Sequence, residues 1–162
     1  LEICIIKCIM KKKLIITESQ YKKLMENEEQ EVLHIPSLKY FNNDWNSLQE
    51  YLESEGNPPY SIGGNLNLVG LKVESLGNLV SVEHDLYAYD TPLKSLGNLT
   101  SVGGLLDLSN TQIESLGNLS FVGGSLVLKG IPLFGKDASP RSLERQSEIL
   151  RRKVYVKGNI LY

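Results

Sequence analysis

The stretch Ser-Leu-Gly-Asn-Leu at residues 75–79 recurs at residues 95–99 and again at residues 115–119, so the chain repeats with a period of 20 residues. No gap separates the three copies. A fixed period of this length predicts a fold in which one short unit stacks on the next and neighbouring units share a core.

Working outward from these copies, aliphatic side chains recur at seven positions of each unit. The alternation of apolar and polar residues at the start of each unit predicts a short strand with one face buried. Because these strands lie one unit apart, we expect them to stack as a parallel sheet, with all seven positions facing inward. In the first unit the positions are Leu66, Leu68, Leu71, Val73, Leu76, Leu79 and Val82, and the counterparts at 86–102 and 106–122 are apolar except Thr91 and Thr111.

This pattern, Leu-x-Leu followed by a turn and an irregular return arm, resembles the leucine-rich repeat family over about residues 62 to 133. Thr91, Thr111, Leu71 and Ile131 stand where the family usually has a turn Asn, and Ala88 replaces a core Leu. The resemblance implies an α/β leucine-rich-repeat solenoid with about five parallel strands and a contact face on the exposed side of that sheet. The text from Met10 is similar to the openings of uncharacterised phage and metagenomic proteins.

Glycine and asparagine also recur in register. Gly103-Gly104 and Gly123-Gly124 precede two of the strands, where a sharp turn or a close backbone approach favours glycine. Asn78, Asn98 and Asn118 recur on the return arm, and we expect their side chains to hydrogen-bond the adjacent unit. Asn98 and Asn118 also begin glycosylation sequons, but with no secretion signal we expect no sugar there.

Residues 10–61 are predicted to form an N-terminal cap, because the first unit would otherwise expose apolar surface and unpaired strand edges. A short strand is expected at 12–17, and a capping box at 17–20 predicts a short helix. A second helix is expected from about Asp44, with Trp45, Leu48 and Leu52 on one face, ending at Gly56.

Residues 134–162 are predicted to form a C-terminal cap. Ser139-Pro140 begins a helix through Arg152 with a buried stripe at Leu143, Ser147 and Leu150. The last residues then match the start of an earlier unit, which predicts a fifth strand in which Ile160 takes the place of Leu126.

Residues 1–9 are interpreted as an extension outside the fold, with an extra strand as the alternative. Both cysteines, Cys4 and Cys8, lie within these residues, so no disulfide framework is indicated. With only His34 and His84 elsewhere, the four residues make a poor zinc set, and we predict no metal.

Composition excludes several functions. A net charge of −2, a pI near 5.8 and basic runs that are not interleaved with aromatic residues argue against nucleic-acid binding. No apolar run is long enough for a membrane span and no secretion signal is evident, so we expect a cytoplasmic location. No phosphate loop, nucleophile elbow or metal-ligand spacing is present, so we predict neither enzymatic activity nor a cofactor.

One cluster of titratable residues, Glu83-His84-Asp85, replaces the Gly-Gly of neighbouring units. It is compatible with acid-base chemistry, with a binding hot spot or with a neutral surface. Consecutive residues of a strand point to opposite faces, so the three cannot all converge on one substrate.

The outward positions of the predicted strands carry tyrosines, aliphatic residues and a few charges, a composition that favours protein contacts. The sequence therefore predicts a non-enzymatic interaction module whose partner protein and oligomeric state are open. The alternative is a scaffold component of a larger assembly, such as a viral or phage particle. The candidate partner-binding residues are Asn67, Asp85, Tyr87, Tyr89, Asp107, Ser109, Val127 and Lys129.

Overall fold

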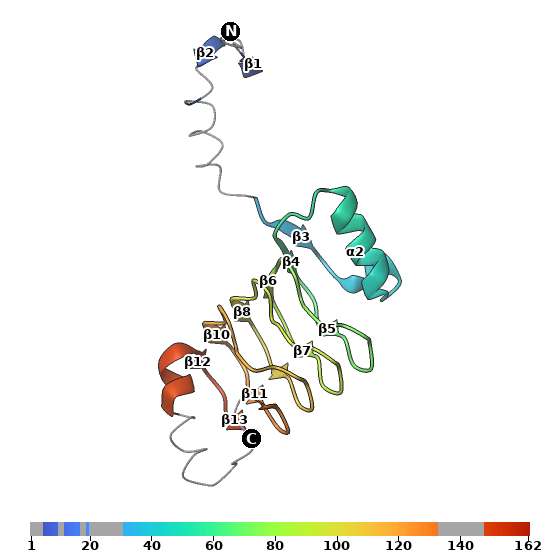
Figure 1. Cartoon of the computed structure of the whole chain (residues 1–162), viewed down its shortest axis with the longest axis vertical. Helices are drawn as coiled ribbons and strands as arrows, with labels where there is room; N and C mark the ends of the chain where they lie inside the picture. Colours follow the sequence, from blue (N-terminus) through green and yellow to red (C-terminus); the bar gives the residue numbers. More distant parts are fainter. Residues whose placement is uncertain (1–4, 10–11, 17–18, 20–30, 133–147) are drawn as a thin grey trace. The chain divides into compact units, whose positions relative to one another are not determined.

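A computed structural model of the chain describes residues 5–9, 12–16, 19, 31–132 and 148–162. The chain divides into two compact units, Leu1–Glu31 and Val32–Tyr162. Each unit is described by itself below, and Figure 1 shows the elements of both.

The first unit contains an antiparallel pair of strands, β1 (Ile5–Ile9) and β2 (Lys12–Ile16), in a sheet of their own. The register pairs Ile5 with Ile16 and Ile9 with Lys12. The strand expected at 12–17 is thus confirmed, and residues 5–9 form a strand as the alternative interpretation had it. The helix expected from Thr17 falls on residues 17–18 and 20–30, which lie outside the described part of the chain.

A five-stranded parallel sheet carries the repeated Leu-x-Leu segments of the second unit. Leu66 pairs with Leu86, Leu86 with Leu106, Leu106 with Leu126 and Leu126 with Ile160, so the predicted parallel sheet and its fifth strand are confirmed. The strands follow the chain order in space (Figure 1): β5 (Leu66–Asn67), β7 (Leu86–Tyr87), β9 (Leu106–Asp107), β11 (Leu126–Val127) and β13 (Ile160–Leu161).

A second parallel sheet, of six strands, was not foreseen. From β4 onward its strands alternate along the chain with those of the five-stranded sheet: β3 (Leu33–Ile35), β4 (Tyr60–Ile62), β6 (Leu79–Val82), β8 (Ser101–Val102), β10 (Phe121–Val122) and β12 (Tyr155–Val156). Strands such as β8 and β10 contribute a single buried residue, Val102 or Val122, whereas each Leu-x-Leu segment contributes two in alternation, so the sequence shows no comparable pattern for this sheet.

Backbone hydrogen bonds join each unit to both of its neighbours. In the five-stranded sheet the N–H of Leu86 donates forward to the carbonyl of Leu105 at 2.8 Å. In the six-stranded sheet the N–H of Gly103 donates backward to the carbonyl of Val82, also at 2.8 Å. The same two patterns recur one unit later, so every internal unit depends on the unit on each side for backbone partners.

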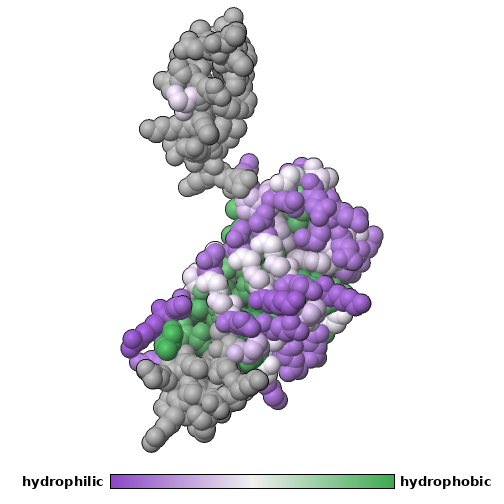
Figure 2. Space-filling model, viewed as in Figure 1, coloured by the Kyte–Doolittle hydropathy of each residue, from purple (hydrophilic) through white to green (hydrophobic). Residues whose placement is uncertain are grey.

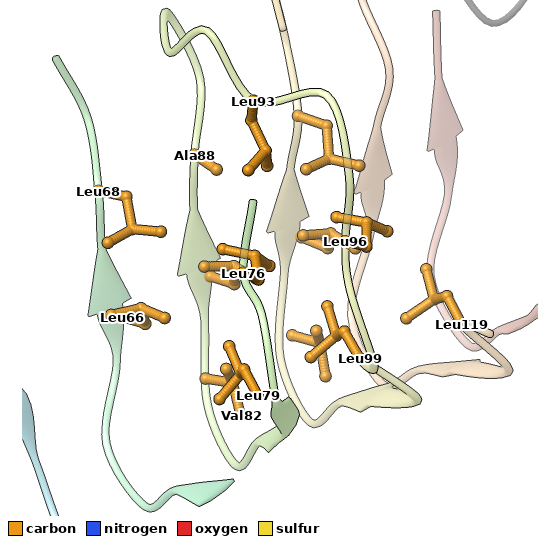
Figure 3. Packing of buried hydrophobic residues seen from close by; sticks show 14 of the residues in the cluster. Leu66, Leu68, Leu76, Leu79, Val82, Ala88, Leu93, Leu96, Leu99 and Leu119 are labelled. Carbon is orange, nitrogen blue, oxygen red and sulfur yellow. The ribbon is translucent and has the colours of Figure 1, made fainter. Parts of the chain in front are cut away.

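The core consists of the aliphatic positions identified from the repeat. Figure 3 shows Leu66 and Leu68 pointing into the same interior as Leu79 and Val82. All the expected inward positions of the three units are buried except Leu71, which is 37% exposed and corrects the prediction. Leu71 follows β5, the edge strand of the five-stranded sheet, so no preceding unit covers its turn.

The two polar inward residues, Thr91 and Thr111, are buried and satisfied. Their hydroxyl groups donate to the carbonyls of Ala88 and Leu108 at 2.6 and 2.7 Å. Because a buried hydroxyl without a partner costs free energy, this local bond explains why threonine is tolerated at an apolar position of the repeat.

The glycine pairs allow the backbones of neighbouring units to approach closely. A Cβ at Gly103 would collide with the backbone carbonyl of Glu83, and one at Gly123 with that of Gly103. Positive φ occurs at two other recurring turns, one with Gly70, Asp90, Asn110 and Gly130 and one with Gly77, Gly97 and Gly117. The glycine pairs therefore permit the tight spacing of the units, as expected.

On the return arm, Asn78 donates to the carbonyl of Asn57 at 2.7 Å, and Asn98 donates to the side chain of Asn78 at 3.0 Å. The expected contacts between units are therefore present at these two asparagines.

The helix expected near Asp44 is confirmed as α2 (Trp45–Ser54), which follows a short 3-10 helix, η1 (Leu38–Phe41). Asp44 caps it by accepting from the N–H groups of Asn46 and Ser47 at 3.1 and 3.3 Å. The hydroxyl of Ser47 also donates to Asp44, and these bonds lower the pKa of that carboxyl. The predicted buried face of Trp45, Leu48 and Leu52 is observed.

Of the expected C-terminal helix, residues 148–153 are described and are helical, with Leu150 buried. The predicted positions Leu143 and Ser147 lie outside the described residues. The limits proposed for the two caps and for the repeats stay predictions.

Replacing Leu106 by Asp should unfold the second unit as a whole, because Leu106 is 0% exposed and lies in a core shared by all units. Removing a buried leucine side chain alone costs about 2 to 5 kcal/mol, and burying a charge adds to that. Thermal unfolding followed by circular dichroism measures the loss. Leu71→Asp is the matched control, and an equal effect of both changes, or an unchanged midpoint for Leu106→Asp, would refute the inward assignment.

Stability should also fall at high pH because of Tyr60. Burial raises the pKa of Tyr60 to about 12, whereas an unfolded tyrosine has a pKa of about 10. The neutral form is favoured in the folded state, so this contribution is complete below pH 10, declines as pH rises and is lost above 12. It amounts to about 3 kcal/mol at most. Denaturant unfolding at pH 9 and 11 should show a smaller decline for Tyr60→Phe than for the parent, and equal declines would contradict the assignment.

Candidate interaction surface

The eight predicted site residues lie on the outer face of the five-stranded sheet or directly beside it. Register places one row across all five strands: Asn67, Tyr87, Asp107, Val127 and Leu161. Each of the first four lies between two buried core residues of its own strand segment, so its side chain is on the opposite face. Asn67 and Lys129 are exposed, and the other predicted residues are half-buried. We call this surface the tyrosine face.

Asp85 joins neighbouring strands at the tyrosine face. One carboxylate oxygen accepts from the N–H of Leu105 in the next unit at 2.7 Å, and the other accepts from the hydroxyl of Tyr87 at 3.0 Å. Its own N–H donates to the side chain of Asn65 in the preceding unit at 3.1 Å. Asp85 therefore has a structural role, and it also holds the ring of Tyr87 in place.

Asp107 and Asn67 occupy equivalent positions and form the same local turn. Asn67 accepts from the N–H of Val69 at 3.1 Å, and Asp107 accepts from the N–H of Ser109 at 2.9 Å. The hydroxyl of Ser109 donates to the same oxygen, Oδ1, at 2.6 Å. A short polar side chain that accepts from the backbone N–H two residues later is typical of turns. The two bonds to Oδ1 of Asp107 leave its Oδ2 without a donor among the described residues.

The carboxylates of Asp85 and Asp107 both act on the hydroxyl group of Tyr87. The hydrogen bond to Asp85 raises the pKa of Tyr87, and the charges of Asp85 and Asp107 act in the same direction. The described residues form two ion pairs of Lys or Arg, Lys94–Glu74 and Arg152–Glu148, and neither involves Asp85 or Asp107.

The cluster Glu83-His84-Asp85 does not converge. Asp85 belongs to the tyrosine face, whereas Nδ1 of His84 lies 2.9 Å from the carbonyl of Gly63. Glu83 instead approaches Nδ1 of His34 at 4.0 Å. The expectation that these three side chains cannot act on one substrate agrees with this geometry.

His34 and Ser61 form a contact that sequence reasoning missed. Nδ1 of His34 lies 3.2 Å from the hydroxyl oxygen of Ser61, on neighbouring strands of the six-stranded sheet. The same nitrogen is the one nearest Glu83, whereas a proton relay through a histidine uses its two different nitrogens. The contact between His34 and Ser61 depends on the register of the six-stranded sheet, which the sequence pattern does not predict. Within the described ranges, no group of three or more His, Cys, Asp or Glu could hold a metal ion.

The outer face of the six-stranded sheet differs from the tyrosine face. Register aligns the small residues Ser61, Ser81 and Ser101, followed by Phe121 and Tyr155. The rings of Phe121 and Tyr155 stack with centroids 5.9 Å apart. Figure 2 shows hydrophobic surface near β10 and β12, whereas the surface over α2 is mostly hydrophilic.

Compared with protein-family models, with curated proteins and with solved structures, the chain matches none. Within the described part of the chain, no helix is both long and apolar enough to cross a membrane.

The role of Asp85 predicts a change in the ionisation of Tyr87. Asp85→Asn removes the charge but keeps an oxygen that can accept from Leu105, so we expect the pKa of Tyr87 to fall toward about 10. The ¹³Cζ shift of Tyr87 against pH measures this, with Asp90→Asn as a control for a carboxylate in the adjacent turn. An unchanged titration in Asp85→Asn would show that the Asp85–Tyr87 bond is not formed in solution.

Proposed function

We propose that this chain is a small leucine-rich-repeat solenoid that binds a partner protein through the tyrosine face. The repeat pattern over residues 62–133 supports the family assignment, together with strand pairing between residues 20 positions apart. In this proposal the chain catalyses no reaction and serves as a rigid binding module.

The observation that carries the proposal is the contrast between the two sides of one strand segment. The inward residues Leu86 and Ala88 are fully buried, whereas Tyr87 and Tyr89 stand on the other side and are only half-buried. Tyrosines held on a rigid sheet contribute contact area at low entropic cost, which makes them frequent anchors of protein interfaces. The hydrogen bond from Tyr87 to Asp85 preorganises one of these anchors.

The size of the tyrosine face suits a short segment of a partner. Five strands about 4.8 Å apart span only about 19 Å, so the face is smaller than a standard interface of about 800 Å² per partner. An extended peptide or a single loop fits this area better than a large domain.

A cytoplasmic location is part of the proposal. The side chain of Asn98 donates to Asn78, so a glycan attached at the Asn98 sequon would break a contact between units. This bond favours a compartment in which Asn98 is not glycosylated.

Partner binding should depend on the tyrosines of this face. We expect the double variant Tyr87→Ser, Tyr89→Ser to lose at least about tenfold in affinity, since anchor residues each contribute more than about 1 kcal/mol. The measurement is quantitative capture from a lysate of the native host, followed by titration of the captured protein against each variant. Tyr40→Ser is the matched control, because Tyr40 is 76% exposed on the separate 3-10 helix η1.

Capture that survives the double variant, or that is lost equally in Tyr40→Ser, would contradict the proposal. Concentration-dependent self-association of the double variant, measured by sedimentation, would instead support the scaffold alternative.

A further inference from the structure

The tyrosine face presents carboxylate charge that the described residues of the chain do not neutralise. Asp107 is directly across from Tyr87 in the register, and Asp85 precedes Tyr87 by two residues on the same strand segment. Two exposed carboxylates elsewhere on the chain, Glu74 and Glu148, are paired with cations, Lys94 at 2.8 Å and Arg152 at 2.9 Å. At Asp85 and Asp107, no described Lys or Arg takes this place.

Hydrogen-bond donors are also distributed unevenly over the two carboxylate oxygens of Asp107. Asp107 places both local donors on Oδ1, so Oδ2 has no donor from the described residues. The ring of Tyr87 is fixed by its bond to Asp85 and lies in the field of both carboxylates, as the raised pKa of its hydroxyl indicates. A guanidinium group suits this arrangement, because it can donate hydrogen bonds to the carboxylate oxygen and stack on the face of the aromatic ring.

Two aliphatic residues lie beyond Asp107 in the same register row. Val127 on β11 is half-buried and Leu161 on β13 is 48% exposed, and the exposed Lys129 lies two residues after Val127. Asp107 and Leu161 lie in one register row, two strands apart. Two strand spacings are about 10 Å, which an extended chain covers in about three residues.

We infer that the partner of the tyrosine face is an extended cationic segment, in which an arginine contacts Asp107 and Tyr87 and an aliphatic residue three positions away packs on Val127 and Leu161. This inference rests on the proposed function and names the chemistry of the partner. The carboxylates of Asp85 and Asp107 would repel phosphate groups and acidic peptides. An arginine at this position makes charge-assisted hydrogen bonds that a neutral isostere cannot make.

The test uses two synthetic probe peptides and the full chain. One probe is acetyl-Gly-Arg-Gly-Gly-Leu-Gly-amide, and the other replaces its arginine by citrulline, which has nearly the same shape but no charge. Both are titrated into ¹⁵N-labelled protein and followed by NMR. We expect the arginine probe to shift amide signals around Tyr87, Asp107 and Val127, and to bind at least about tenfold more tightly than the citrulline probe.

Asp107→Asn provides the complementary variant. It should fold, because Asn67 makes the equivalent turn bond at the same position of the preceding unit. We expect it to reduce binding of the arginine probe by about tenfold. Asp90→Asn is the matched control, since Asp90 lies in the adjacent turn and its carboxylate already accepts from Asn110 at 2.8 Å; it should leave binding unchanged.

Equal affinity for the two probes, shifts confined to residues off the five-stranded sheet, or no binding of either probe would overturn the inference. If a captured partner requires Tyr87 and Tyr89 but tolerates Asp107→Asn, then the proposed function stands and only the cationic chemistry is wrong. If that partner tolerates both sets of changes, the proposed function fails as well.

Discussion

The structure depends on a shared interior that no 20-residue unit can enclose alone. Each unit contributes about six or seven buried side chains, yet a single unit would leave most of their surface in contact with water. The favourable burial energy is therefore realised only when a neighbour is in place. The backbone imposes the same condition, because the N–H groups of Leu86 and Gly103 find their acceptors in the following and the preceding unit. Apolar packing and hydrogen bonding thus require the same register.

This common register explains both what the sequence predicts and what it does not. The positions of Leu66, Leu86 and Leu106 could be predicted because burial repeats with the period and the aliphatic residues repeat with it. The exposure of Leu71 could not, because its residue type matches the pattern and only its place beside an edge strand leaves it uncovered. The six-stranded sheet could not be predicted because a strand such as Ser101–Val102 has a single buried residue, whereas each Leu-x-Leu segment has two in alternation.

The candidate site was predictable in position but not in detail. Alternation with buried leucines placed Tyr87 and Asp107 on the outer face, and their register confirms that they are neighbours. The bond from Tyr87 to Asp85 and the turn formed by Asp107 depend on side-chain directions that spacing does not determine. The contact between His34 and Ser61 was beyond reach, since it joins strands from either side of α2.

The two sheets impose different demands on their outer residues, and this difference is the reason for proposing the five-stranded sheet as the binding surface. On the six-stranded sheet, the aligned residues Ser61, Ser81 and Ser101 are too small to anchor a partner, and Phe121 is already covered in part by the ring of Tyr155. On the five-stranded sheet, the side chain of Asp85 accepts a bond from the backbone of the next unit, but among the described residues those of Tyr87 and Tyr89 accept none. Large side chains at these two positions therefore leave the bonds between units intact. The rings of Tyr87 and Tyr89 therefore add contact surface to a scaffold whose stability is already supplied by the opposite face.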